Sequence, residues 1–275
     1  MRAKLSRIYK TIKAFQMSLA ASILIFLLGF AVFFKSFNSV EQQVQLQIAT
    51  QSPVSVFPDF STFTVVETKK QRFLDYLELF VSEERRSINA LRSKLLLLQG
   101  HLEKGEQLGG EESTWALALA KKYRLDPMNF TEKEIIEELI LRVDLIPASL
   151  ALAQAANESA WGTSRFTILG NNIFGQWCYE IGCGIVPARR AAGATHEVKA
   201  FDTIQQSVEA YFLNINTHES YSYLRDLRAK MRKRDLKLDP MSLAIGLGRY
   251  SQRGDRYVDE IQRIIIQNDL RARDG

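Results

Sequence analysis

Residues 148–162 read ASLALAQAANESAWG, and this stretch decides the fold. Six of these residues are alanine, which combines the highest helix propensity with little bulk. Pro147 suits the first position of a helix, and Gly162 suits the left-handed residue just past its end. Because alanine lets neighbouring elements approach closely on several sides, the stretch predicts an internal helix.

Glu158 lies in the last turn of this predicted helix, where a carboxylate is unfavourable for two reasons. The negative end of the helix dipole disfavours an anion, and burial among alanines beside Trp161 removes water. Both effects predict a pKa of Glu158 above the ordinary value of about 4.3. A carboxylic acid still protonated near neutral pH is what a general acid needs to expel a sugar oxygen. An exposed glutamate in an ordinary ion pair is the alternative.

The residues around and after this helix resemble the core motif of the glucosaminidases, glycoside hydrolase family 73, and of their bacterial Bax-like branch. The resemblance covers about residues 145–270 and extends more weakly back to about residue 60. It rests on these stretches at fixed spacing: Gln154–Gly162, Ser164, Asn171–Gly175, Gln176–Cys178 and Gly182–Gly184.

The resemblance implies a lysozyme-like fold, mainly helical, with a small β-lobe across a groove from the helical lobe. It places Glu158 on the family's catalytic acid, and it implies hydrolysis of the β-1,4 bond after N-acetylglucosamine in peptidoglycan without a cofactor. Further residues are expected to shape the cleft and bind the glycan strand: Gln154, Trp161, Asn171, Asn172, Phe174 and Tyr257.

A second motif lies near the C-terminal end, where residues 247–257 read LGRYSQRGDRY. It resembles the family's two tyrosines around a polar turn, with a separation one residue longer than in the commoner form. The resemblance predicts that Tyr250 faces the cleft as a hydrogen-bond donor near the scissile sugar. Asp255 and Tyr257 are expected to shape the turn and begin the last helix. A purely structural role is the alternative for Tyr250.

Positive charge is concentrated at the N-terminal end of the chain. Of the 36 Lys and Arg that give the net charge of +5, five lie in residues 1–16, which contain no acid. The remaining 31 basic residues balance the 31 acidic ones, so we expect no nucleic-acid partner.

Residues 17–34 carry no charge, and as a helix they extend about 27 Å, against roughly 30 Å for the hydrocarbon core of a bilayer. Cations before this run predict a cytoplasmic arm at 1–16, a single-pass inner-membrane anchor at 17–34, and all later residues in the periplasm. Cleavage as a signal peptide after Ala31, which leaves the chain periplasmic, and a buried core helix are the alternatives.

Residues 35–64 are polar and contain Pro53 and Pro58, which predicts a linker. A helical region at 65–145 follows. Its apolar residues recur with a spacing that predicts one long helix or a kinked pair, packed against the same chain or dimerising as a coiled coil. Glu84 interrupts the second of the two apolar seams, which consist of Leu74, Val81, Ile88 and Leu95, and of Leu77, Leu91 and Leu98.

Further along, capping boxes or capping residues at Thr131 and Thr203 predict two more helices. A helix with many basic residues follows the second of these. Most of its charge is expected to form a solvated face, with contact to anionic wall polymers as the alternative. The basic residues are Arg225, Arg228, Lys230, Arg232, Lys233 and Arg234.

Two β-like stretches, 174–179 and 196–201, predict the small β-lobe. The only cysteines are Cys178, near the end of the first stretch, and Cys183, shortly after it. In an oxidising periplasm we expect them to form a short disulfide, with reduced thiols as the alternative. Two cysteines and three histidines do not complete a tetrahedral site, so no metal is expected.

Glycoside hydrolysis usually needs a second carboxylate or an equivalent. Glu197 and Glu180 are the candidates in the β-lobe, with solvated charge as the alternative for each. The hairpin does not align with the family, so inverting attack by an activated water and attack by the acetamido group of the substrate both stay open.

Together these patterns predict an α+β, lysozyme-like glucosaminidase domain at residues 146–275, mainly helical with a small β-lobe. The predicted protein is a membrane-anchored endo-β-N-acetylglucosaminidase that acts on the glycan strands of peptidoglycan. A lytic transglycosylase on the same fold is one alternative. A non-catalytic, membrane-tethered scaffold that binds the cell wall is another. The sequence identifies no protein partner.

Overall fold

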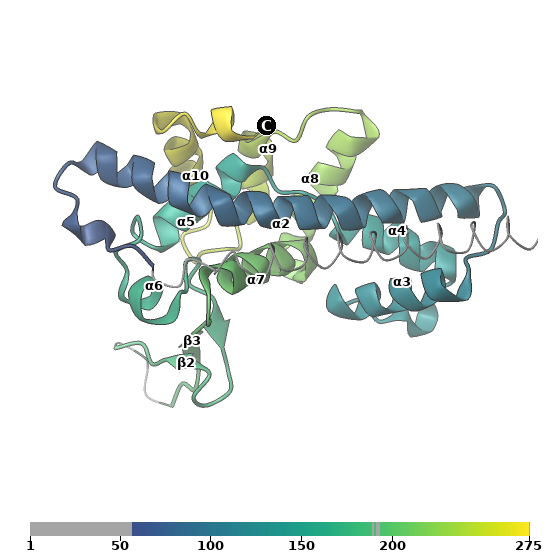
Figure 1. Ribbon diagram of the computed structural model, residues 1–275, viewed down its shortest axis with the longest axis horizontal. Coiled ribbons are helices and arrows are strands. Elements are labelled where there is room, and N and C mark those ends of the chain that lie inside the picture. The colour runs from purple at the N-terminus through teal and green to yellow at the C-terminus, as the bar shows by residue number, and fades with distance from the viewer. Residues whose placement is uncertain (1–56, 189, 191–192, 275) are drawn as a thin grey trace, which may run out of the picture. The chain divides into compact units, whose positions relative to one another are not determined.

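Helix α2, Val66–Glu103, is a single helix of 38 residues, and the other helices gather along it (Figure 1). The computed structural model describes residues 57–188, 190 and 193–274. The apolar seam predicted for this region is buried: Leu74, Val81, Ile88 and Leu95 are each 1% exposed or less. They face α4 (Glu132–Arg142), α5 (Ala148–Glu158) and α7 (Ile204–Thr217) of the same chain. The long helix therefore packs within its own chain.

The other helical elements are shorter, and several begin at the capping residues expected from the sequence. Thr131 and Glu134 form the predicted capping box of α4, and Thr203 caps α7. The remaining α-helices are α3 (Gly110–Lys122), α6 (Arg165–Gly170), α8 (Ser222–Lys233), α9 (Pro240–Ala244) and α10 (Asp255–Gln267). The 3-10 turns are η1 (Phe60–Thr62), η2 (Pro127–Asn129), η3 (Glu219–Tyr221), η4 (Ile245–Leu247) and η5 (Leu270–Arg273).

Helix α5 is the internal helix that its alanines predicted. Nine of its eleven residues are buried, and it contacts α2, α9, α10 and η5. The helix ends at Glu158, earlier than the sequence suggested, because the chain then turns through three consecutive left-handed residues. Their φ angles are 50° at Ala160, 57° at Trp161 and 81° at Gly162.

The turn after α5 is sealed by aromatic rings. A Cβ atom at Gly162 would lie 2.5 Å from Cδ2 of Phe60 and 2.9 Å from Cδ2 of Phe73. Phe60 belongs to η1, inside the stretch predicted as a linker, and it is 1% exposed. The linker prediction missed the even spacing of Phe57, Phe60 and Phe63, which matches the three residues per turn of a 3-10 helix.

The β-lobe is a small antiparallel sheet with strand order β1-β3-β2. The strands are β1 (Trp177–Cys178), β2 (Gly184–Ile185) and β3 (Glu197–Lys199), and Trp177 and Ile185 both pair with Val198. A Cys178–Cys183 disulfide closes the loop between β1 and β2. Strand β2 has only two residues, so the alternation of apolar and polar residues could not predict it from the sequence. In Figure 1 the sheet extends below α6 and α7, and β2 contacts α6.

The N-terminal predictions fall on residues that the structure does not describe. The basic arm 1–16, the membrane segment 17–34 and the linker as far as residue 56 all lie outside the described range. From residue 57 on, the described residues belong to one compact unit, Val56–Gly275. Within this range, no helix is long and apolar enough to span a bilayer.

Most of the charge on the basic helix α8 is exposed, as the sequence predicts, but Arg228 is an exception. Arg228 is fully buried, and together with Arg232 and Arg92 of α2 it surrounds the buried carboxylate of Asp144. The shortest of these pairs joins Arg232 Nη2 and Asp144 Oδ1 at 2.8 Å. The guanidinium of Arg228 also donates to backbone carbonyl groups of Leu141 and Asp144. Helical periodicity could not reveal this, because the partner lies 84 residues away in the chain.

We expect Asp144→Asn to lower the free energy of unfolding by about 3–5 kcal/mol, because it leaves buried guanidinium groups without a counter-charge. Urea unfolding of the two proteins measures the difference. Asp259→Asn, on the exposed face of α10, is the matched control. A loss of less than about 1 kcal/mol, the range of exposed ion pairs, would contradict a stabilising role of this cluster.

Candidate active site

Glu158 is the last residue of α5, and its carboxyl group lies near residues of α5, of α10 and of the loop that precedes β1. Asn157 Nδ2 donates a hydrogen bond to Glu158 Oε1 at 3.2 Å. The Tyr257 hydroxyl, at the start of α10, also hydrogen-bonds to the carboxyl group. Gly175 lies opposite, where an added Cβ atom would be 3.8 Å from Glu158 Oε2. The carboxyl group is thus held between the helical core and the loop that leads to the β-lobe.

Burial raises the pKa of Glu158 above its ordinary value, and Glu260 adds to this by like-charge repulsion. The hydrogen bonds from Tyr257 and Asn157 and the positive charge of Arg253 act in the opposite direction but do not outweigh burial. The direction predicted from the sequence is therefore confirmed. A larger fraction of this carboxyl group is protonated near neutral pH than of an exposed glutamate.

A chain of hydrogen bonds leads from the core to Glu158. Tyr211 donates its hydroxyl hydrogen to Gln154 Oε1 at 2.6 Å, and Gln154 Nε2 donates to the Tyr257 hydroxyl at 2.9 Å. These three side chains are at most 1% exposed. Because Tyr257 accepts from Gln154, its single hydroxyl hydrogen is available for the carboxyl group of Glu158.

The two tyrosines of the second motif lie side by side. Tyr257 is in the first turn of α10, as predicted, and Tyr250 donates its hydroxyl hydrogen to the backbone oxygen of Phe174 at 3.0 Å. Its ring stacks on Tyr257, with centroids 5.3 Å apart and an interplanar angle of 6°. Tyr257, expected mainly to shape the turn, is the tyrosine that meets Glu158. The sequence motif names both residues but not which one reaches the carboxyl group.

Four of the six predicted glycan-binding residues are buried. Gln154, Tyr257, Asn172 and Phe174 are each 2% exposed or less, which keeps these side chains from direct contact with a sugar. Asn172 accepts from the Gln176 backbone N–H and donates to the Lys199 carbonyl oxygen, so it joins the loop to β3. Phe174 stacks on the Tyr211 ring at a centroid distance of 3.9 Å. The structure gives these four residues a framework role.

The other two predicted glycan-binding residues are partly exposed. Asn171 adopts a left-handed conformation with φ 51°, and its Nδ2 donates to the Phe201 carbonyl oxygen at 2.9 Å. Trp161 packs edge-on against Phe73, and the Lys70 ammonium group lies 5.2 Å from the centre of its ring. Both residues thus also have structural contacts.

The two candidate second carboxylates lie in different environments. Glu197 is 5% exposed and accepts backbone hydrogen bonds from Gly182 at 3.1 Å and Gly184 at 2.8 Å, which lower its pKa. Glu180 is exposed at the tip of the lobe. The charged groups that act on Glu158 are instead Arg253 and Glu260, which pair with each other. Neither residue is predictable as part of the site, because neither stands out in the sequence by its spacing.

Comparison with known proteins identifies the family. Residues 133–270 match the model of the glucosaminidase family, described as mannosyl-glycoprotein endo-beta-N-acetylglucosaminidase. The chain belongs to this family. It is 31% identical to protein bax of Escherichia coli (strain K12) over 203 residues, which cover 74% of this chain and 71% of that protein. The glucosaminidase resemblance drawn from the sequence motifs, with its Bax-like branch, is confirmed.

A solved structure is also similar to this glucosaminidase-family chain. The catalytic domain of the autolysin Auto from Listeria monocytogenes matches with a TM-score of 0.36 and 18% identity. The match covers 85% of this chain and 97% of that domain. The fold class expected for the described residues, mainly helical with a small sheet, agrees with the elements observed.

Removing one hydroxyl group tests the hydrogen bond to Glu158. We expect Tyr257→Phe to raise the pKa of Glu158 further, by about one unit, because it removes a donor that favours the ionised form. A ¹³C NMR titration of labelled glutamate carboxyl groups measures the pKa, and Glu158→Gln assigns the signal. Tyr223→Phe, 52% exposed on α8, is the control. An unchanged or lower pKa in Tyr257→Phe would show that the phenol does not stabilise the carboxylate.

Proposed function

We propose that this chain is an endo-β-N-acetylglucosaminidase that cleaves the glycan strands of peptidoglycan, with Glu158 as the general acid. Membership of the glucosaminidase family supports a glycosidase reaction. The observation that carries the assignment of the acid is the partly buried carboxyl group of Glu158, whose pKa is raised and to which the Tyr257 hydroxyl donates a hydrogen bond. A general acid must hold its proton until the glycosidic oxygen needs it.

In the proposed reaction, the proton of Glu158 passes to the bridging oxygen as the bond between that oxygen and the anomeric carbon breaks. The carboxylate that remains accepts hydrogen bonds from Asn157 and Tyr257, and Arg253 supplies a favourable charge. These groups are already in place before the reaction, so they need no reorganisation when the charge forms.

For the nucleophile, we infer that the acetamido oxygen of the substrate attacks the anomeric carbon. The position of Glu197, clamped by two backbone N–H groups, and the exposure of Glu180 favour this route over activation of a water by either residue. A cyclic intermediate then forms. Water opens it, and the Glu158 carboxylate takes a proton from that water, which restores the acid.

We further propose that the reaction takes place in the periplasm, with residues 17–34 as a membrane anchor. The apolar run preceded by basic residues supports the anchor. The Cys178–Cys183 disulfide is compatible with an oxidising compartment.

The decisive experiment compares the parent protein with Glu158→Gln on purified peptidoglycan. We expect the substitution to reduce the rate by about 10²–10⁴-fold, because it keeps the shape and removes the acid. Glu137→Gln, exposed on α4, is the matched control and should keep the parental rate. A parental rate in Glu158→Gln, with an unchanged melting temperature, would rule out Glu158 as the acid.

Mass spectrometry of the products from the same digests distinguishes the reaction types. New reducing N-acetylglucosamine ends support the hydrolase. Anhydro-muramyl ends would indicate a lytic transglycosylase, which uses one acid on the same fold. Binding to insoluble peptidoglycan without released sugar would indicate a non-catalytic scaffold.

A further inference from the structure

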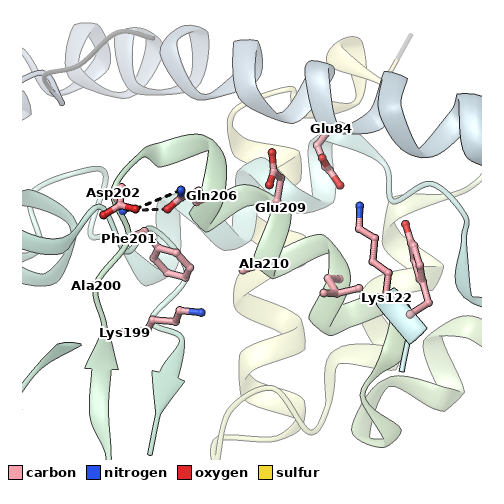
Figure 2. Close-up of a pocket in the computed structure, with 11 residues that line it drawn as sticks. Glu84, Lys122, Lys199, Ala200, Phe201, Asp202, Gln206, Glu209 and Ala210 are labelled. Atoms are coloured by element: carbon pink, nitrogen blue, oxygen red, sulfur yellow. Dashed lines mark hydrogen bonds between the residues drawn. The ribbon is translucent and has the colours of Figure 1, made fainter. Parts of the chain in front are cut away.

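A cavity of about 430 Å³ lies between α2, α3, β3 and α7, and Glu158 is not among its lining residues (Figure 2). Four of its charged side chains come from four elements: Glu84 from α2, Lys122 from α3, Lys199 from β3 and Glu209 from α7. The fifth is Asp202, between β3 and α7, which accepts a hydrogen bond from Gln206 at 3.5 Å. The rest of the lining includes the apolar side chains of Phe201, Ala210 and Leu213. The volume is within the range of about 300–1,000 Å³ that is usual for small-molecule sites.

Helix α7 separates this cavity from the candidate active site. Tyr211 faces the hydrogen-bond chain to Glu158, whereas Glu209, two residues earlier, faces the cavity. Two residues along an α-helix correspond to a rotation of about 200°, so the two side chains point to opposite sides. The cavity is therefore a separate feature of the fold.

Glu84 is the unexpected residue in this cavity. It takes the position in the second apolar seam of α2 at which the sequence pattern calls for a leucine, between the buried or half-buried Leu77 and Leu91. In Figure 2 its carboxyl group lies near that of Glu209, with the Lys122 ammonium group below. Burial, reinforced by the negative charge of Glu209, raises the pKa of Glu84 to about 7.

The charges in the cavity converge without pairing. Within the described part of the chain, Glu84 and Lys122 form no ion pair within 4.0 Å and no side-chain hydrogen bond with each other or with Glu209. Glu209 accepts only from Gln205, at 3.2 Å, and the Lys199 ammonium group lies 5.0 Å from the centre of the Phe201 ring. The carboxylates of Glu84 and Glu209 thus repel each other, which is unfavourable, and the positive charge of Lys122 offsets this only in part because it forms no ion pair with either.

We propose that this cavity binds a small ligand that carries both an ammonium group and a carboxylate, with the ammonium group between Glu84 and Glu209. A cation at this point removes the repulsion of the carboxylates, and Lys122 or Lys199 meets the ligand's own carboxylate. The apolar side chains of Phe201 and Leu213 accommodate the methylene groups between the two charges. We identify the ligand as the peptide that branches from the glycan strand, and this identification rests on the proposed function.

The test uses the full-length chain and a synthetic peptide, acetyl-Ala-Glu-Lys, at pH 8. Its N-terminus is blocked, as in a peptide joined to a sugar, so the lysine side chain supplies the only ammonium group. Isothermal titration calorimetry measures its Kd. We expect acetylation of the lysine Nε to weaken binding at least tenfold, and putrescine, which has no carboxylate, to bind at least tenfold more weakly than the peptide.

Variants locate the site on the protein. Glu84→Gln and Glu209→Gln should each raise the Kd at least tenfold. Glu83→Gln, next to Glu84 on α2 but exposed and paired with Arg86, should leave it unchanged. Melting temperatures establish that all three variants are folded. Equal affinity for the free and acetylated peptides, equal affinity in Glu84→Gln and the parent, or no binding at millimolar concentrations would each overturn the proposal.

These outcomes are independent of the proposed glycosidase activity, because the peptide contains no glycosidic bond. A chain that cleaves peptidoglycan but does not bind the peptide overturns the ligand of this cavity alone. A chain that binds the peptide through Glu84 but does not cleave the glycan overturns the catalytic assignment. The proposal that the cavity binds a ligand with an ammonium group and a carboxylate then still holds.

Discussion

The burial of α5 on all sides is the constraint on which the rest of the structure depends. Its alanines allow α2, α9, α10 and η5 to approach it together, and a larger side chain would separate at least one of them. The same packing limits the sequence where the helix ends, since only a glycine at position 162 combines the left-handed turn with the close approach of the Phe60 and Phe73 rings. Glu158 therefore emerges from the core at a defined place, with the loop at Gly175 opposite.

Two polar side chains inside this core, Gln154 and Asp144, are tolerated because they have partners. The amide of Gln154 uses both its oxygen and its nitrogen, between Tyr211 and Tyr257, and the carboxylate of Asp144 is surrounded by arginines. A buried network is stabilising only when its members are satisfied, so these residues also restrict how the helices can pack. Helix α7 contributes to the first network and, through its other face, lines the cavity at Glu84. The two polar regions thus share one rigid element.

Local features of the structure were predictable from the sequence. The α5 helix, the capping box of α4, the buried seam of α2 and the raised pKa of Glu158 all follow from residues within a few turns of one another. The errors concern contacts between distant residues. Gln154 meets Tyr257, 103 residues away, and Arg228 is buried by a partner 84 residues away. Periodicity carries no information about such contacts, so the sequence pattern predicts a glycan contact for Gln154 and does not distinguish Arg228 from the exposed basic residues of α8.

Burial and the Tyr257 hydrogen bond act on Glu158 in opposite directions, and a general acid needs both. Burial alone would keep the proton on Glu158. It would also raise the free energy of the carboxylate that remains after proton transfer, because burial removes the water that would stabilise the charge. The hydrogen bonds alone would stabilise the anion and release the proton too early. In this structure burial is the larger effect, so the pKa of Glu158 is raised and its acid form is more populated than in an exposed glutamate. The donors from Tyr257 and Asn157 are nevertheless already oriented toward the group that becomes charged. Since Tyr257 is held by Gln154, and Gln154 by Tyr211, this orientation is set by the buried core rather than by the substrate.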